Sequence, residues 1–89
     1  MTALALSALP RRVKVCEMGP RDGLQNESGI VPSADKIRLI DLLSRSGLPL
    51  VEATSFVHPS AIPQLADAEA VMSGIARRPG VTYLCLVPN

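Results

Sequence analysis

The stretch SADKIRLIDLLSRSGLPLVEAT, residues 33–54, determines the fold class that this sequence predicts. Its first part predicts a helix that opens at Ser33, a favourable N-cap residue, and that carries apolar side chains at helical spacing. Gly47 suits the left-handed residue that ends a helix, and a proline two residues later prevents continuation. The last part, residues 50–54, is apolar except for Glu52 and predicts a short strand. The expected apolar stripe of the helix consists of Ile37, Leu39, Ile40, Leu42 and Leu43.

The same alternation of strand and helix extends on both sides of this stretch. Residues 13–18 alternate apolar and polar side chains and predict a strand that ends at Gly-Pro, and the polar residues 21–32 then predict a loop. Beyond the middle strand we expect a loop at 55–63, a helix over about 64–77 and a strand at 81–87. The inward face of the second helix is expected to hold Leu65, Ala68, Val71, Met72 and Ile75.

The order of strand, helix, strand, helix, strand implies parallel strands joined by right-handed crossovers. Residues 1–12 are expected to form a flexible lead-in, and residues 13–89 to hold the three strands and two helices. A parallel sheet of three strands leaves much apolar surface uncovered. We therefore expect a β-α-β-α-β portion of a larger α/β domain, truncated after the third strand, with a small independent three-layer unit as the alternative.

The composition indicates a folded protein and argues against two classes of partner. Of the 89 residues, 47% are hydrophobic, and the formal net charge is +1. A charge near zero gives no electrostatic case for binding nucleic acid or an anionic membrane, and one Phe, one Tyr and no Trp make a base-stacking surface unexpected. Residues 1–12 have no basic segment ahead of their apolar run, which is too short to span a bilayer, so the sequence predicts a cytoplasmic protein.

The cysteines and the single histidine are not predicted to carry chemistry. Cys16 and Cys85 each lie in an apolar run and lack the close spacing of a metal site, so we expect two reduced core thiols rather than redox or nucleophilic groups. His58 lies in a proline-flanked loop with no carboxylate or cysteine at triad-like spacing, which favours an exposed loop residue over a metal ligand or base.

The unusual polar residues follow the predicted strands. Parallel α/β folds bind their ligands at the carboxyl ends of the strands, and the starts of the same strands carry no comparable cluster. We therefore expect a site at the carboxyl edge of the sheet. The residues concerned are Arg21, Asp22, Gln25 and Asn26 after the first strand, Glu52, Thr54 and Ser55 at the end of the second, and Asn89 after the third.

Arg21, Asp22 and Glu52 have the chemistry of an active site, and each also has a simpler interpretation. A guanidinium suits developing enolate charge, and a carboxylate offers hard oxygen to a divalent cation. A plain loop salt bridge would explain the adjacent Arg21 and Asp22 equally well. Glu52 is costly to bury unpaired, so it is expected to neutralise Arg21, to support a metal or to hold a substrate hydroxyl, unless it faces solvent.

Four blocks of residues resemble one enzyme family. The string EMGPRDGLQNE at 17–27 is similar to the first-strand signature of hydroxymethylglutaryl-CoA lyases. EATSFV at 52–57, PQ and AD within 63–67, and PN at 88–89 follow in the family's order and at its spacing. The resemblance covers nearly everything from Val13 onward. Related Claisen-type synthases share the Arg-Asp-Gly core but match the longer string less well.

This resemblance implies a (β/α)8 TIM-barrel lyase that cleaves 3-hydroxy-3-methylglutaryl-CoA into acetyl-CoA and acetoacetate, a reaction of leucine degradation and ketone body metabolism. By matching position it implies that Asp22 ligates a divalent cation, Mg²⁺ or Mn²⁺, and that Arg21 stabilises the enolate of the departing acetyl thioester. It further implies a catalytic role for Glu52 and substrate binding by Gln25 and Ser55. An acyl-CoA substrate and a homo-oligomeric full-length protein follow from the same resemblance.

The family's other metal ligands, a His-x-His pair and an Asn, and its loop cysteine are not among these residues. A complete barrel needs about 250 residues. We therefore expect the 89-residue chain to be inactive alone. The alternatives are a lyase for a longer 3-hydroxy-3-alkylglutaryl-CoA, a related Claisen-type acyltransferase and, in another class, a non-catalytic remnant or interaction module.

Overall fold

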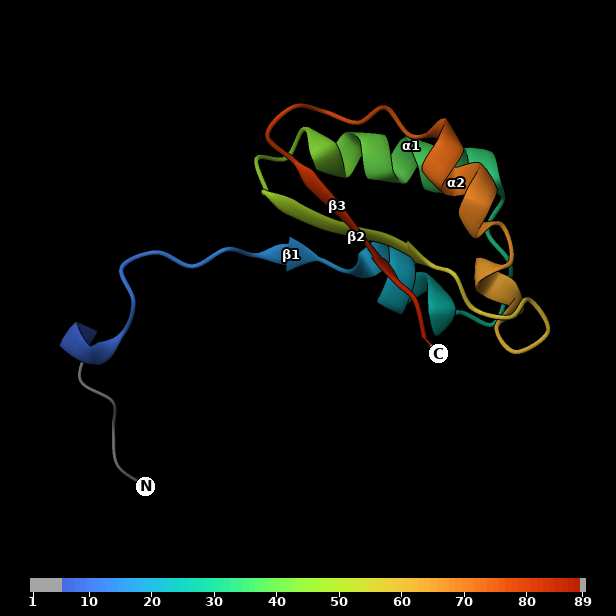
Figure 1. Cartoon of the computed structure of the whole chain (residues 1–89), viewed down its shortest axis with the longest axis horizontal. Coiled ribbons are helices and arrows are strands. Elements are labelled where there is room, and N and C mark those ends of the chain that lie inside the picture. Colours follow the sequence, from blue (N-terminus) through green and yellow to red (C-terminus); the bar gives the residue numbers. More distant parts are fainter. Residues whose placement is uncertain (1–5, 89) are drawn as a thin grey trace, which may run out of the picture.

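The computed structural model describes residues 6–88 and contains one parallel sheet (Figure 1). Its strands are β1 (Cys16–Glu17), β2 (Leu50–Ser55) and β3 (Thr82–Leu86), in the spatial order β1-β2-β3. Both pairings are parallel, as the sequence predicted. Asn89 and the first five residues of the expected lead-in lie outside the described residues, so the predictions made for them are not addressed.

Two helices, α1 (Ser33–Ser44) and α2 (Ala68–Gly74), cover the same face of this sheet (Figure 1). Side chains along a strand alternate between its two faces, and Val51 and Ala53 are the buried pair that faces the helices. The core cluster consists of Ile40, Val51, Ala53, Val71 and Ile75. Burial of these apolar side chains is the main force that holds the two helices on the sheet.

The boundaries of α1 confirm most of the predicted helix and correct its start. Gly47 has a φ of 93°, as expected for the left-handed residue after a helix. Ser33 is the first helical residue rather than the N-cap, and its hydroxyl donates to Asp67 Oδ2 at 2.5 Å. The predicted apolar stripe is narrower than expected, because Leu39 and Leu42 are 37% and 55% exposed on the outward side.

The second helix is shorter than the predicted 64–77. A 3₁₀ turn, η3 (Pro63–Leu65), comes first, and α2 ends at Gly74, after which Ile75 has an extended backbone. Close packing of the helices requires a glycine at this end, because a Cβ on Gly74 would lie only 2.4 Å from Ile37 Cδ1. A glycine at this point lowers helix propensity as well. The predicted inward residues of this segment are nevertheless buried or half-buried.

The segment around β1 differs most from the prediction. Only Cys16 and Glu17 of the expected strand 13–18 pair with β2. Residues 13–15 have no neighbouring strand to bond, and Val13 and Val15 are exposed. Part of the expected loop 21–32 is helical instead. A wide helical turn, η2 (Gly19–Gly23), starts directly after β1, with the Met18 carbonyl accepting from the backbone N–H of Arg21 at 3.1 Å and of Asp22 at 2.7 Å.

Neither helix in the described part of the chain has the length and apolar content needed to span a bilayer.

Candidate active site

The helical turn after β1 and the middle of β2 bring Arg21 and Glu52 together. Arg21 Nε donates to Glu52 Oε1, and the two side chains are 14% and 13% exposed. Glu52 lies on β2 between Val51 and Ala53, so it points away from the helices and toward the face on which Arg21 sits. Of the interpretations left open, neutralisation of Arg21 is confirmed, and a solvent-facing Glu52 is wrong.

This pair is held more firmly than a surface ion pair. A half-buried charge is stable only when a partner compensates for its lost hydration. Since Glu52 takes the Nε hydrogen, the orientation of the guanidinium is restricted, and Nη1 lies near the Asp22 carboxylate. The arrangement therefore provides an oriented positive group at the carboxyl end of β1.

Asp22 lies beside this pair with most of its carboxylate open to solvent. Its side chain is 60% exposed, and Arg21 Nη1 lies 3.5 Å from Asp22 Oδ1, a long and weak contact. The predicted loop salt bridge is therefore present but occupies little of the carboxylate. Asn26 Nδ2 donates to the backbone carbonyl of Asp22 at 2.9 Å and so holds the turn in shape.

The start of the turn depends on Gly19. Its backbone N–H donates to Glu17 Oε1 at 3.0 Å. A Cβ at this position would lie 2.7 Å from the same oxygen, so any larger residue would displace the Glu17 carboxylate. Gly19 leaves room for this contact between the Glu17 carboxylate and the first residue of the turn.

The donor set suits one ligand of a divalent cation rather than a complete site. The open carboxylate of Asp22 is a hard oxygen donor of the kind that Mg²⁺ and Mn²⁺ prefer. Within residues 6–88, no group of three or more His, Cys, Asp or Glu side chains could hold a metal ion. Asp22 therefore fits as a single contributor, and metal binding stays a prediction.

Ser55 and Gln25, two residues predicted to bind substrate, lie in different environments. Ser55 is 1% exposed, and its hydroxyl donates to the Leu86 carbonyl at 3.0 Å, which ties the end of β2 to the end of β3. Gln25 lies half-buried in the helical segment that carries Arg21 and Asp22. Substrate binding by either residue stays a prediction, and for Ser55 the hydroxyl already has a structural partner.

The cysteines and the histidine have no role in this geometry. Cys16 and Cys85 are free and half-buried, and burial raises the pKa of the Cys85 thiol, which disfavours the reactive thiolate. His58 is exposed, and its Nδ1 contacts the Ser60 hydroxyl at 2.6 Å and the Ser60 N–H at 3.2 Å. The expectation of an exposed loop histidine is confirmed.

A buried polar cluster close to the site was not predicted. Lys36 is 3% exposed, and its ammonium donates to Asp67 Oδ1 at 2.6 Å and to the Gln64 carbonyl. Burial raises the pKa of Asp67, but hydrogen bonds from Lys36 and Ser33 outweigh this and lower it overall. The helical period of the sequence could have predicted that Lys36 is buried, because Lys36 lies four residues before the buried Ile40 and thus on the inward face of α1.

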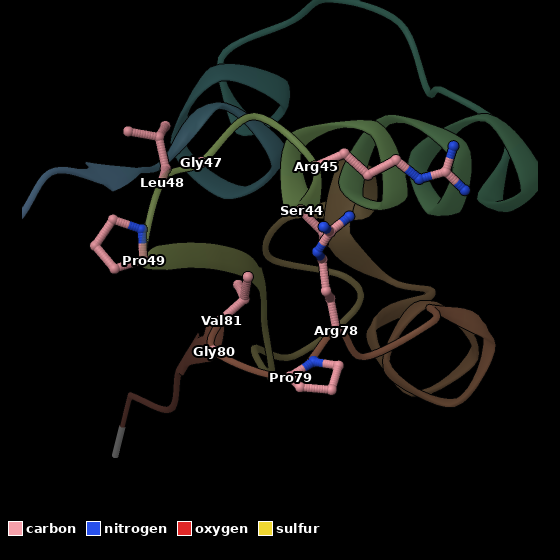
Figure 2. A pocket seen from close by; sticks show the side chains of 9 residues that line it. All are labelled: Ser44, Arg45, Gly47, Leu48, Pro49, Arg78, Pro79, Gly80 and Val81. Carbon is pink, nitrogen blue, oxygen red and sulfur yellow. The ribbon is translucent and has the colours of Figure 1, made fainter.

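The opposite edge of the sheet carries a shallow hollow between the end of α1 and the starts of β2 and β3 (Figure 2). Gly47, Pro49, Gly80 and Val81 form much of its wall. Figure 2 shows the Arg45 side chain extending back along α1, away from the hollow. The hollow is lined mainly by turn residues and brings no acid, base or nucleophile together.

The fold and the site together define the class of protein: a parallel α/β unit with its unusual polar residues at the carboxyl edge of the sheet. No family model matches the chain. A hydroxymethylglutaryl-CoA lyase from chicken is 62% identical over 82 residues, which are 92% of this chain and 28% of that protein. The chain is thus related over nearly its whole length to the hydroxymethylglutaryl-CoA lyases, as its motifs predicted.

Solved structures give the same result. The HMG-CoA lyase of Bacillus subtilis is 56% identical, with a TM-score of 0.87 over 90% of this chain and 27% of that one. An HMG-CoA lyase from Acinetobacter baumannii, solved with coenzyme A and 3-methylmalate, is 47% identical, with a TM-score of 0.84 over 98% of this chain and 28% of that one. This chain therefore spans about a quarter of the length of the relatives it matches.

The predicted cytoplasmic location is wrong by this comparison. The chicken, rat and mouse relatives, at 56–62% identity, are all named as mitochondrial enzymes, while a zebrafish relative, 58% identical over 84 residues, is named as cytoplasmic. The prediction rested on the composition of residues 1–12 alone, and such a short stretch is too little to determine where a protein is sent.

Proposed function

We propose that this chain is part of a lyase that cleaves 3-hydroxy-3-methylglutaryl-CoA into acetyl-CoA and acetoacetate. The observation that carries the proposal is the Arg21–Glu52 pair at the carboxyl edge, with the open Asp22 carboxylate beside it. The similarity to named lyases along nearly the whole chain supports the same reaction and an acyl-CoA substrate. In this proposal the three parallel strands are part of a (β/α)8 barrel, the fold in which such an edge forms the active site.

The roles of the residues follow from their settings. Cleavage of the carbon–carbon bond leaves negative charge on the thioester oxygen of the acetyl fragment. The oriented guanidinium of Arg21 stabilises that charge, and Glu52 keeps the guanidinium in place through Nε. Orientation before the reaction is what makes such a group effective, since little reorganisation is then needed in the transition state.

Asp22 would hold the divalent cation with its open carboxylate. When bound, Mg²⁺ or Mn²⁺ supplies a Lewis acid that lowers the pKa of the tertiary alcohol that must lose its proton. The weak 3.5 Å contact with Arg21 leaves the carboxylate accessible while keeping positive charge close to it. Gln25, on the same helical segment, would add a polar contact to substrate.

A chimera tests the proposal directly. Residues 13–88 of this chain would replace the matched segment of the Bacillus subtilis lyase, with which it shares 56% identity. We expect the chimera to release acetyl-CoA with kcat within about tenfold of the host enzyme, and we expect Arg21→Met to lower kcat about 10²- to 10³-fold, as loss of a charge-stabilising donor does. Coupled spectrophotometric assay of acetoacetate measures both.

The matched control is Arg38→Met, which removes a guanidinium from α1, away from the carboxyl edge. It should leave kcat unchanged. A chimera that folds cooperatively and is inactive with both Mg²⁺ and Mn²⁺ would show that the site assigned to this chain does not support the reaction.

A further inference from the structure

Lys36 is a buried charge that the proposed chemistry does not use. It lies on the inward face of α1, is 3% exposed, and bonds to Asp67 Oδ1 and to the Gln64 carbonyl. An apolar side chain of similar size would fill this place at lower desolvation cost. The reason for a buried lysine at this position therefore lies in the segments that its hydrogen bonds connect.

The contacts of Lys36 are part of a continuous polar chain, the Lys36 clamp, formed by Glu27, Ser33, Lys36, Gln64 and Asp67. Gln64 Nε2 donates to the Glu27 carbonyl at 2.9 Å, while its own carbonyl accepts from Lys36. Asp67 accepts from Lys36 with one oxygen and from the Ser33 hydroxyl with the other.

The clamp connects the two segments that leave the candidate active site. One is the chain after β1, which carries Arg21 and Asp22 and reaches Glu27 before α1 begins; the other is the chain after β2, which reaches Gln64 and Asp67 before α2 begins. Figure 1 shows these two connections running close together below the start of α1. Through Gln64, both connections are tied to Lys36 in the first turn of α1.

We propose that Lys36 is a positioning residue for the active site, acting through Gln64 on the segment that carries Arg21 and Asp22. The expected effect on catalysis rests on the proposed lyase function. The expected effect on the backbone of residues 19–27 rests on the hydrogen bonds alone. Catalysis by an oriented group is sensitive to displacements of an ångström or less, so a loosened segment lowers the rate of the chemical step more than it weakens substrate binding.

Hydrogen exchange in the full chain tests the mechanical part without requiring activity. In Lys36→Met and in Gln64→Met, we expect backbone amides within 19–27 to exchange at least about fivefold faster. The control is Tyr83→Phe, which removes a hydroxyl bonded to Ser44 Oγ at 2.7 Å near the opposite edge of the sheet. This variant should leave the exchange rates of the backbone amides within 19–27 unchanged. If Lys36→Met does not fold, Gln64→Met carries the test, because its bond to Glu27 lies at the surface.

Kinetics in the chimera test the catalytic part. We expect Lys36→Met to lower kcat about tenfold with KM within about twofold, Lys36→Arg to recover part of the loss, and Tyr83→Phe to leave kcat unchanged. Unchanged exchange in 19–27, or equal acceleration in all three variants, overturns the clamp as a positioning device. Faster exchange in 19–27 together with an unaltered kcat overturns the catalytic role of Lys36. If the parent chimera itself is inactive, that result counts against the proposed lyase function, and the exchange experiment still tests the clamp.

Discussion

At the residue scale, the candidate site depends on a contact between side chains that are thirty-one positions apart. The sequence indicated the participants, because polar residues at the ends of apolar strands are costly unless they are paired or functional. It also left four interpretations of Glu52 open. The tertiary contact with Arg21 decides two of them, pairing with Arg21 and exposure to solvent, and it depends on the helical turn at 19–23, which replaces part of the expected loop.

Glu52→Gln should destabilise the chain by about 1–3 kcal/mol, since it leaves the Arg21 charge mostly buried without a compensating carboxylate. Urea unfolding of the 89-residue chain measures this change. The control Glu69→Gln removes an exposed acid from the first turn of α2 and should cost less than about 0.5 kcal/mol. Equal losses for the two variants would mean that the Arg21–Glu52 pair contributes no more than a surface charge.

At the element scale, periodicity predicted all three strands and both helices, and the errors lie at their ends. β1 is shorter than its alternating pattern because only Cys16 and Glu17 have partners on β2. Ser33 is not the N-cap, because the Pro32 carbonyl accepts the first helical bond, from the Lys36 N–H at 3.1 Å, while the Ser33 hydroxyl donates to the distant Asp67. The length of β1 depends on pairing with a distant strand, which a local pattern does not contain.

The last residue of α2, Gly74, packs closely against Ile37 of α1, and this gives a prediction at the same scale. Gly74→Ala should destabilise the chain by about 1 kcal/mol, because the strain of overpacking exceeds the small gain in helix propensity at a terminal position. The new Cβ would lie 2.4 Å from Ile37 Cδ1. In an Ile37→Val background, which lacks that methyl, the cost should shrink. A double-mutant cycle by chemical denaturation measures the coupling, and additive effects would contradict the packing account.

At the scale of the whole molecule, the helices α1 and α2 cover one face of the sheet, while the other face is covered only in part, by the helical turn η2 against β2. Leu84 pairs with Glu52 across β2 and β3 and is 39% exposed on this partly covered face, with Leu86 at 44% nearby. Apolar side chains beside a half-buried ion pair suit the interior of a barrel better than a solvated surface. The resemblance to the lyases and the parallel order were predictable from motifs and element order, whereas the contact between Arg21 and Glu52 became visible only in the spatial arrangement.

The isolated 89-residue chain should therefore show no lyase activity with either Mg²⁺ or Mn²⁺. It brings one open carboxylate to the edge, and a single carboxylate binds these ions weakly, because they require several oxygen ligands in defined geometry. Its partly covered face also leaves the site wet, so that the Arg21 charge is screened by water and stabilises an enolate less. The chimera at the same molar concentration is the positive control in one acetyl-CoA release assay. Turnover by the isolated chain that disappears with Arg21→Met would show that these three strands form a working site by themselves.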